Sequence, residues 1–141
     1  MNTIGAAGIR ERLAEILNEV TYGGKRYIIQ RRGHPLAAII PASEYQALIE
    51  MLSTTGISGD IHGIPVTVYF DGERYLIKDD RFELYGEGAT LENARHDYWL
   101  AIRETMEDLE ADADRLAPYL ATRLKDLRKI VDAASQGEKA A

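Results

Sequence analysis

A polar, glycine-rich stretch at residues 53–63 divides this chain of 141 residues into two parts and limits what each part can fold into. Its three glycines lie among serine, threonine and aspartate, a composition typical of a connection between folded units. We therefore predict a first domain over residues 1–52, a linker over 53–63, a second domain over residues 64–133 and a frayed tail over 134–141. A first domain of about fifty residues is too small to bury a sufficient apolar core by itself.

The first domain begins with a helical pattern. Its apolar residues recur every three or four positions, which predicts an amphipathic helix: Ile9, Leu13, Ile16, Leu17 and Val20. The paired Gly23-Gly24 is expected to end this helix, because glycine readily adopts the left-handed conformation. Residues 26–30 and 35–40 are rich in β-forming side chains and predict a hairpin, and a second helix is expected over residues 43–52.

The second domain alternates strand and turn signals before it becomes helical. Asp71-Gly72 lies between two β-rich runs and predicts a hairpin, and residues 82–86 predict a third strand. Thr90 is the expected N-cap of a long helix, and an apolar stripe over residues 116–131 predicts an extra helix around or after Pro118. The expected fold class of the whole chain is α+β.

Composition excludes several kinds of chemistry. The chain has no cysteine, which excludes disulfides, thiol catalysis and thiolate metal sites. Its three histidines lie far apart without ligand spacing, so we expect no metal site and no cofactor. The start shows no signal-peptide pattern, and the longest uncharged apolar stretch, residues 35–42, is too short to span a bilayer. We expect a cytoplasmic protein with no membrane partner.

Charge is distributed unevenly along the chain. Residues 1–52 carry six basic and five acidic side chains, whereas residues 53–141 carry eleven basic and eighteen acidic ones. Because net charge bears on the choice of partner, the first part is compatible with a polyanion such as DNA. The acidic second part would be repelled by a polyanion and would complement a basic protein.

Enzymatic signals are weak. The acidic residues at 104–114 could hold a cation or act as an acid–base pair, but charge runs on the polar side of a helix are usually solvated. His96-Asp97 has no nucleophile beside it, and Gly86-Glu87-Gly88 lacks the third glycine and the lysine of a phosphate loop. We do not expect an enzyme; a metal-dependent activity at 104–114 is the alternative that a Glu107→Gln variant would reveal.

Four arginines form a better organised set. Arg10 and Arg12 lie in the first turns of the predicted first helix, and Arg31 and Arg32 close the first strand of the hairpin. The planar guanidinium group donates two parallel hydrogen bonds and therefore suits phosphates and guanine edges. On spacing alone, the opposite interpretation is equally good, namely surface arginines that pair with the glutamates of the same helix.

The small size of the first domain favours a homodimer. Its apolar faces need a partner, most simply a second copy, and the predicted dimer core comprises Leu13, Leu17, Ile29 and Ile39. A symmetric dimer would double the arginine set and place two equal footprints on the two halves of a DNA duplex.

The order of these residues is similar to that of a known family. The chain reads Gly8-Ile9-Arg10-Glu11-Arg12-Leu13 in the helix, Arg26-Tyr27-Ile28-Ile29 in the strand, Arg31-Arg32-Gly33-His34-Pro35 at the turn, and Pro41 followed by Glu44-Tyr45. Over residues 1–52 this pattern closely resembles the Phd/YefM antitoxin family. One departure is Ala6-Ala7-Gly8, where the family often has a polar entry into the helix.

The resemblance implies a β-α-β-β-α module that forms a homodimer with a shared core, binds operator DNA and represses its own toxin–antitoxin operon. It also implies that Arg10 and Arg31 contact DNA, with Arg12 and Arg32 as auxiliary contacts. Whether dimers pair into tetramers on DNA is left open, and so are the toxin and the operator sequence.

The second domain departs from this family, whose members usually end in a segment that wraps the toxin. Residues 64–115 instead look folded, and their strands with the Gly86-x-Gly88 entry into a helix weakly resemble the partial ribonuclease-H-like domain of HicB antitoxins. We expect a C-terminal β-β-β-α unit with an extra helix that binds a cognate toxin. The predicted toxin contacts are Trp99, Ile102, Leu109, Leu120, Leu124 and Leu127. Packing of this stripe within the domain or across the dimer is the alternative.

The leading hypothesis is therefore the antitoxin of a type II toxin–antitoxin system, with operator DNA and a toxin as its partners. The alternative is a Phd-like protein-interaction module that dimerises and binds a partner protein without sequence-specific DNA binding.

Overall fold

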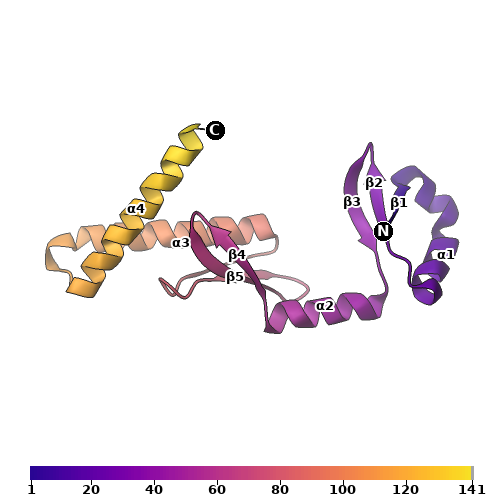
Figure 1. Ribbon diagram of the computed structural model, residues 1–141, viewed down its shortest axis with the longest axis horizontal. Helices are drawn as coiled ribbons and strands as arrows, with labels where there is room; N and C mark the ends of the chain where they lie inside the picture. Colours follow the sequence, from indigo (N-terminus) through magenta and orange to yellow (C-terminus); the bar gives the residue numbers. More distant parts are fainter. Residues whose placement is uncertain (141) are drawn as a thin grey trace. The chain divides into compact units, whose positions relative to one another are not determined.

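The computed structural model describes residues 1–140 and divides into two compact units, Met1–Ile49 and a second unit that begins at Glu50 (Figure 1). Helix α2 (Ala42–Thr54) contributes residues to both units. The predicted linker over 53–63 is wrong, because residues Ile57–Ile61 form strand β4. Because β4 lies at the edge of its sheet, polar residues and glycine are tolerated in it, and its composition resembles that of a loop.

The first unit has the element order β-α-β-β-α. Its elements are β1 (Asn2–Gly5), α1 (Ala6–Gly23), β2 (Tyr27–Arg31), β3 (His34–Ile39) and the start of α2. The sheet order is β1-β2-β3, with β1 parallel to β2 and β2 antiparallel to β3. A parallel pair needs a crossover connection, and α1 supplies it.

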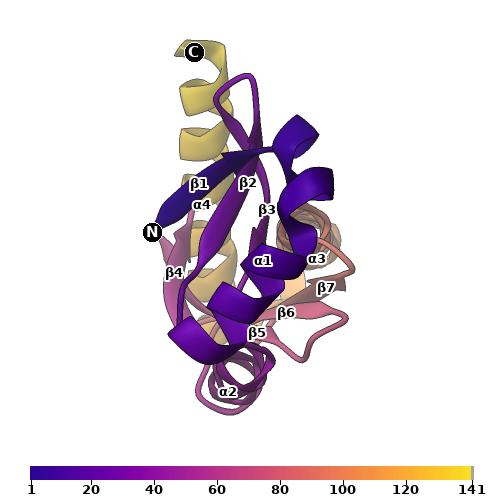
Figure 2. The same ribbon diagram turned by 90° about the vertical axis from the view of Figure 1, so that its right-hand side faces the viewer.

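The core of the first unit is small. Helix α1 packs against the sheet (Figure 2) and buries Ile16 and Val20 against Ile4 and Tyr27. The helical spacing of Ile16 and Val20 places both on one face, as the sequence predicts. Two further leucines of the predicted stripe remain about half exposed, so one copy of this unit does not bury its apolar surface.

The second unit is a four-stranded antiparallel sheet followed by helices. Its elements are β4, β5 (Ile64–Phe70), β6 (Tyr75–Lys78), β7 (Tyr85–Gly88), α3 (Leu91–Ala111), the short helix η1 (Ala113–Arg115) and α4 (Pro118–Ala140). The sheet order is β4-β5-β6-β7. The α+β class is confirmed, whereas the predicted three strands are four, and the strand expected at residues 82–86 lies at 85–88.

Helices α3 and α4 begin at residues that favour a helix start. The Thr90 side chain accepts a hydrogen bond from the Asn93 amide at 3.1 Å, which confirms Thr90 as the N-cap of α3. Pro118 starts a new helix, α4. The prediction that residues 134–141 fray is wrong for 134–140, since α4 continues to Ala140 and Ala134 is buried; residue 141 lies outside the described residues.

A buried carboxylate organises the loop between β6 and β7. The Asp79 carboxylate accepts hydrogen bonds from the Phe82 amide, from the Leu84 amide at 3.2 Å and from the Tyr98 hydroxyl at 2.8 Å. Burial and this carboxylate raise the pKa of Tyr98 far above its ordinary value, so the hydroxyl stays protonated and donates. Because the loop turns around Asp79, residues 82–84 are not free to pair as a strand.

Helix α3 lies unusually close to β7. A Cβ atom at Gly86 would lie 2.2 Å from the Tyr98 backbone nitrogen, and one at Gly88 would lie 2.8 Å from the Ala94 nitrogen. The glycines of Gly86-Glu87-Gly88 are therefore explained by close packing of strand and helix rather than by a phosphate loop.

Candidate nucleic-acid interface

The start of α1 and the end of β2 meet at one edge of the first unit. Parallel pairing places Gly5 opposite Gln30, so the residue before the helix lies beside the penultimate residue of β2. A recess of about 350 Å³ opens here, and it is lined by Gly5, Ala6, Ala7, Gln30, Arg31 and Arg32. The structure thus brings two of the predicted DNA-binding arginines to the N-terminus of the first helix.

The first turn of α1 has no side-chain cap. Gly5 occupies the N-cap position in an extended conformation and offers no side chain to the first helical amides. Unpaired amides and the positive end of the helix dipole favour an anion at this position. At Ala6-Ala7-Gly8 this chain lacks the polar helix entry that the family often has. The backbone N–H groups of the first turn of α1 are therefore available as donors beside Arg31 and Arg32.

The hairpin turn holds Arg32 in an uncommon backbone conformation. Arg32 and Gly33 have φ values of 52° and 78°, the pattern of a two-residue turn with both central residues left-handed. The left-handed conformation is unfavourable for arginine, whereas asparagine is favoured at this position of the turn.

An Arg32→Asn variant should therefore separate stability from binding. We expect the first unit to become more stable by up to about 1 kcal/mol, because the strained arginine is removed. DNA affinity should fall, because each chain loses a cation at the recess. Urea unfolding and fluorescence anisotropy with promoter DNA measure the two effects; a stabilised variant that binds as tightly as the wild type would remove Arg32 from the interface.

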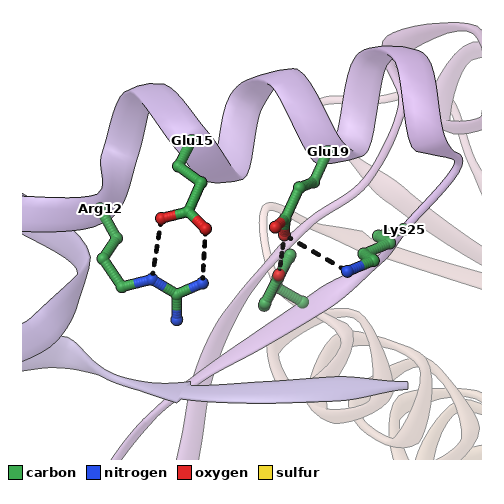
Figure 3. A network of polar contacts seen from close by, with 5 residues as sticks. Arg12, Glu15, Glu19 and Lys25 are labelled. Atoms are coloured by element: carbon green, nitrogen blue, oxygen red, sulfur yellow. Dashed lines mark hydrogen bonds and ion pairs between the residues drawn. The ribbon is translucent and has the colours of Figure 1, made fainter.

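Arg10 and Arg12 lie on different flanks of α1. Helical spacing places Arg10 next to Leu17, whereas Arg12 shares its flank with Glu15 and Glu19. The Arg12 guanidinium lies 3.3 Å from the Glu15 carboxylate (Figure 3), and this contact raises the pKa of Arg12. Phosphate would have to compete with Glu15 for Arg12.

A second contact network closes the same flank. The Tyr27 hydroxyl donates to the Glu19 carboxylate. The Lys25 ammonium lies 3.8 Å from the same carboxylate (Figure 3). These contacts lower the pKa of Glu19, with the Tyr27 hydrogen bond as the main cause. This flank therefore carries paired charges, and within residues 1–138 no ion pair involves Arg10, Arg31 or Arg32.

The predicted dimer-core residues lie at the boundary between core and surface. Leu13 and Leu17 are 45% and 47% exposed, whereas Ile29 and Ile39 are half-buried and pack against the small core. Leu36 on β3 is 54% exposed. The first unit thus carries large apolar side chains that one copy leaves in contact with solvent.

The predicted toxin-contact residues are largely internal. Ile102, Leu124 and Leu127 are at most 3% exposed within the core of the second unit, so they cannot contact a partner while this unit is folded. For these three the prediction is wrong, and packing within the domain, the alternative, is what the structure shows. An apolar stripe alone does not reveal whether its own domain or a partner covers it.

The other three predicted contacts are half-buried. Leu109 packs against the same core, and Leu120 lies on α4. Trp99 also packs against the core, and its ring lies 4.4 Å from the ring of His62 in the turn between β4 and β5. These side chains already have partners within the second unit or offer only part of their surface.

The acidic residues at 104–114 do not form a metal centre in the described part of the chain. No group of three or more histidine, aspartate or glutamate side chains there is placed to hold a metal ion. Glu110 instead faces Arg128 on α4 at 3.1 Å, and Asp112 faces Arg115 at 3.3 Å.

None of the helices among residues 1–140 has the length and hydrophobicity needed to cross a membrane.

Sequence reasoning missed the part of the recess that is not basic. Gln30 and the first amides of α1 line it, and only the parallel pairing of β1 with β2 brings them together. In the sequence, the only signal that Gln30 belongs to this recess is that it precedes Arg31.

One comparison with known protein families matches the first unit. Residues 1–55 match the model of the family described as antitoxin Phd_YefM, type II toxin-antitoxin system. The first unit is therefore similar to the Phd/YefM antitoxins, and we call it the Phd/YefM-type unit. The resemblance predicted from the sequence is thereby confirmed over this segment, which contains the recess and all four arginines.

Two further comparisons are less informative. A crystal structure from Syntrophomonas wolfei subsp. wolfei, assigned as an antitoxin part of a toxin/antitoxin system, is similar at 17% identity and a TM-score of 0.41, over 93% of this chain and 88% of that one. A TM-score of this size is too low to establish a shared fold. No curated protein matches the chain.

Proposed function

We propose that this protein is the antitoxin of a type II toxin–antitoxin system, a cytoplasmic homodimer that binds the promoter of its own operon and neutralises a cognate toxin. The observation that carries the proposal is the match of residues 1–55 to the Phd/YefM antitoxins, in a unit with arginines beside an uncapped helix start. No catalytic step is assigned to it.

Dimerisation follows from the exposed apolar surface of the Phd/YefM-type unit. Only four apolar side chains are buried in its core, whereas Leu13, Leu17 and Leu36 are about half exposed. Burial of a leucine side chain contributes about 1.5–3 kcal/mol. A second copy that covers these leucines would therefore stabilise the unit by several kcal/mol. A dimer would present Arg10, Arg31 and Arg32 twice.

The second unit is the part proposed to bind the toxin. Residues from 53 onward carry an excess of seven acidic charges, which suits a basic partner and opposes binding of nucleic acid by this part. DNA binding is therefore assigned to the Phd/YefM-type unit alone.

The salt dependence of DNA binding tests the proposal. If a dimer places six arginines on phosphates, the logarithm of the affinity for promoter DNA should fall with the logarithm of salt concentration with a slope of about −5. Fluorescence anisotropy on a duplex from upstream of the gene, with a scrambled duplex as control, provides the measurement. Binding of a partner protein without any shift of promoter DNA would instead favour the protein-interaction module.

A further inference from the structure

The sheet of the second unit has one covered face and one open face. Helix α3 covers the face that carries Val66 and Ile77, both of which are buried in the core. Because side chains alternate along a strand, Tyr69 and Leu76 point to the opposite face. Among the described residues, the core of the second unit has no helix residue on that side, and only the end of α2, at Ser53, borders it; we call it the open sheet face.

Strand register gathers aromatic and aliphatic side chains at the centre of the open sheet face. Tyr69 pairs with Leu76, and Lys78 pairs with both Thr67 and Tyr85. Tyr85 is 61% exposed. A recess of about 440 Å³ lies over β5 and β6, and its lining includes Tyr69, Leu76 and Lys78. The centre of this face therefore offers a tyrosine and a leucine around a hollow, together with an exposed second tyrosine.

The border of the open sheet face is acidic. Its exposed carboxylates are Asp60, Asp71, Glu73, Asp80, Glu83 and Glu87. Arg74 and Lys78 are the basic residues on this face within the described chain, and Arg74 lies 3.8 Å from Glu87. Arg81 is directed to Asp126 on α4, at 3.4 Å. The border thus keeps a clear negative excess.

Backbone hydrogen bonds stabilise the negative charge of one carboxylate at this border, that of Asp71. The Asp71 carboxylate accepts hydrogen bonds from the amides of Glu73 and Arg74 at 2.9 and 2.8 Å. These bonds lower the pKa of Asp71, so its charge persists in mildly acidic solution.

We propose that the open sheet face, rather than the leucine stripe of α3 and α4, is the surface through which the second unit binds a basic partner protein. The inference rests on the proposed function, in which that partner is the toxin. An aromatic centre with a charged border is the usual anatomy of a protein interface, and the negative border selects a positive partner. The same charge opposes nucleic acid. The buried positions of Ile102, Leu124 and Leu127 leave the helical stripe without this capacity.

Matched tyrosine variants test the surface in the full-length chain. The probe is the protein encoded by the reading frame adjacent to this gene. Tyr85→Ala on the open sheet face should weaken its binding by about tenfold or more, because exposed aromatic anchors dominate many interfaces. Tyr119→Ala is the control, because Tyr119 on α4 is 70% exposed and the substitution is the same. It should change the Kd by less than about twofold.

A charge-reversal pair gives an independent measurement. Asp80→Lys at the border should weaken binding and slow association, whereas Asp108→Lys on the polar side of α3 should do so much less. Both carboxylates are exposed, so neither substitution should unfold the second unit.

The outcomes separate this surface from the proposed function. If the wild-type chain does not bind the adjacent gene product, the antitoxin function itself fails. If the wild type binds and both Tyr85→Ala and Asp80→Lys bind equally well, the open sheet face is the wrong surface while the function stands. If Tyr85→Ala changes the sedimentation of the chain alone, the face is a contact between copies and the proposal is overturned.

Discussion

Arg31→Ala is expected to weaken promoter binding by at least about thirtyfold while leaving the fold and the oligomeric state unchanged. Arg31 lines the recess at the start of α1, is exposed, and has no ion pair within residues 1–138. Each DNA contact of an arginine is worth about 1–3 kcal/mol, and a symmetric dimer loses two at once. Removal of an exposed, unpaired side chain should change stability by less than about 0.5 kcal/mol.

Arg12→Ala is the matched control for this prediction. Arg12 pairs with Glu15 on the other flank of α1, so its loss should affect DNA binding much less than the loss of Arg31. Anisotropy titrations and urea unfolding of both variants decide the matter. Unfolding of Arg31→Ala would identify Arg31 as a structural residue, and unchanged affinity would place DNA binding elsewhere.

Gly86→Ala is expected to destabilise the second unit by about 3 kcal/mol or more. A Cβ atom at this position would meet backbone atoms of α3, including the Tyr98 nitrogen at 2.2 Å, and a backbone cannot give way as a flexible side chain does. Relief would require α3 to move away from β7, which would open the core around Tyr98 and Ile77. Thermal unfolding followed by circular dichroism should show a large loss of stability.

Gly59→Ala provides the control within the same sheet. A Cβ atom at Gly59 would meet the Val66 side chain at 3.5 Å, an ordinary van der Waals distance. This variant should keep wild-type stability or gain up to about 1 kcal/mol from the less flexible unfolded chain. Equal stability of the two variants would show that α3 does not pack directly against β7 at Gly86.

Local patterns were sufficient for the elements whose residues form their own signal. The spacing of Ile16 and Val20 predicted α1, and Thr90 predicted the start of α3. Strand β4 was missed, because an edge strand tolerates polar residues and glycine without losing its pairing. Its residues 57–61 are visible as a strand only through their partners in β5.

For the candidate sites too, the sequence reveals the residue types, but the contacts between distant segments depend on the fold. The arginines are recognisable from sequence, whereas the recess at Gly5 and Gln30 depends on the parallel pairing of β1 and β2. The buried positions of Ile102, Leu124 and Leu127 depend on how α3 and α4 pack, because periodicity gives only the apolar side of a helix and not what covers it.

Sedimentation equilibrium of the full-length chain at micromolar concentration tests the central claim most directly. We expect a dimer, because the Phd/YefM-type unit leaves Leu13 and Leu17 about half exposed. Leu17→Glu should convert this dimer into a folded or partly folded monomer that no longer binds promoter DNA. A stable, folded monomer of the wild-type chain would contradict the proposed dimer.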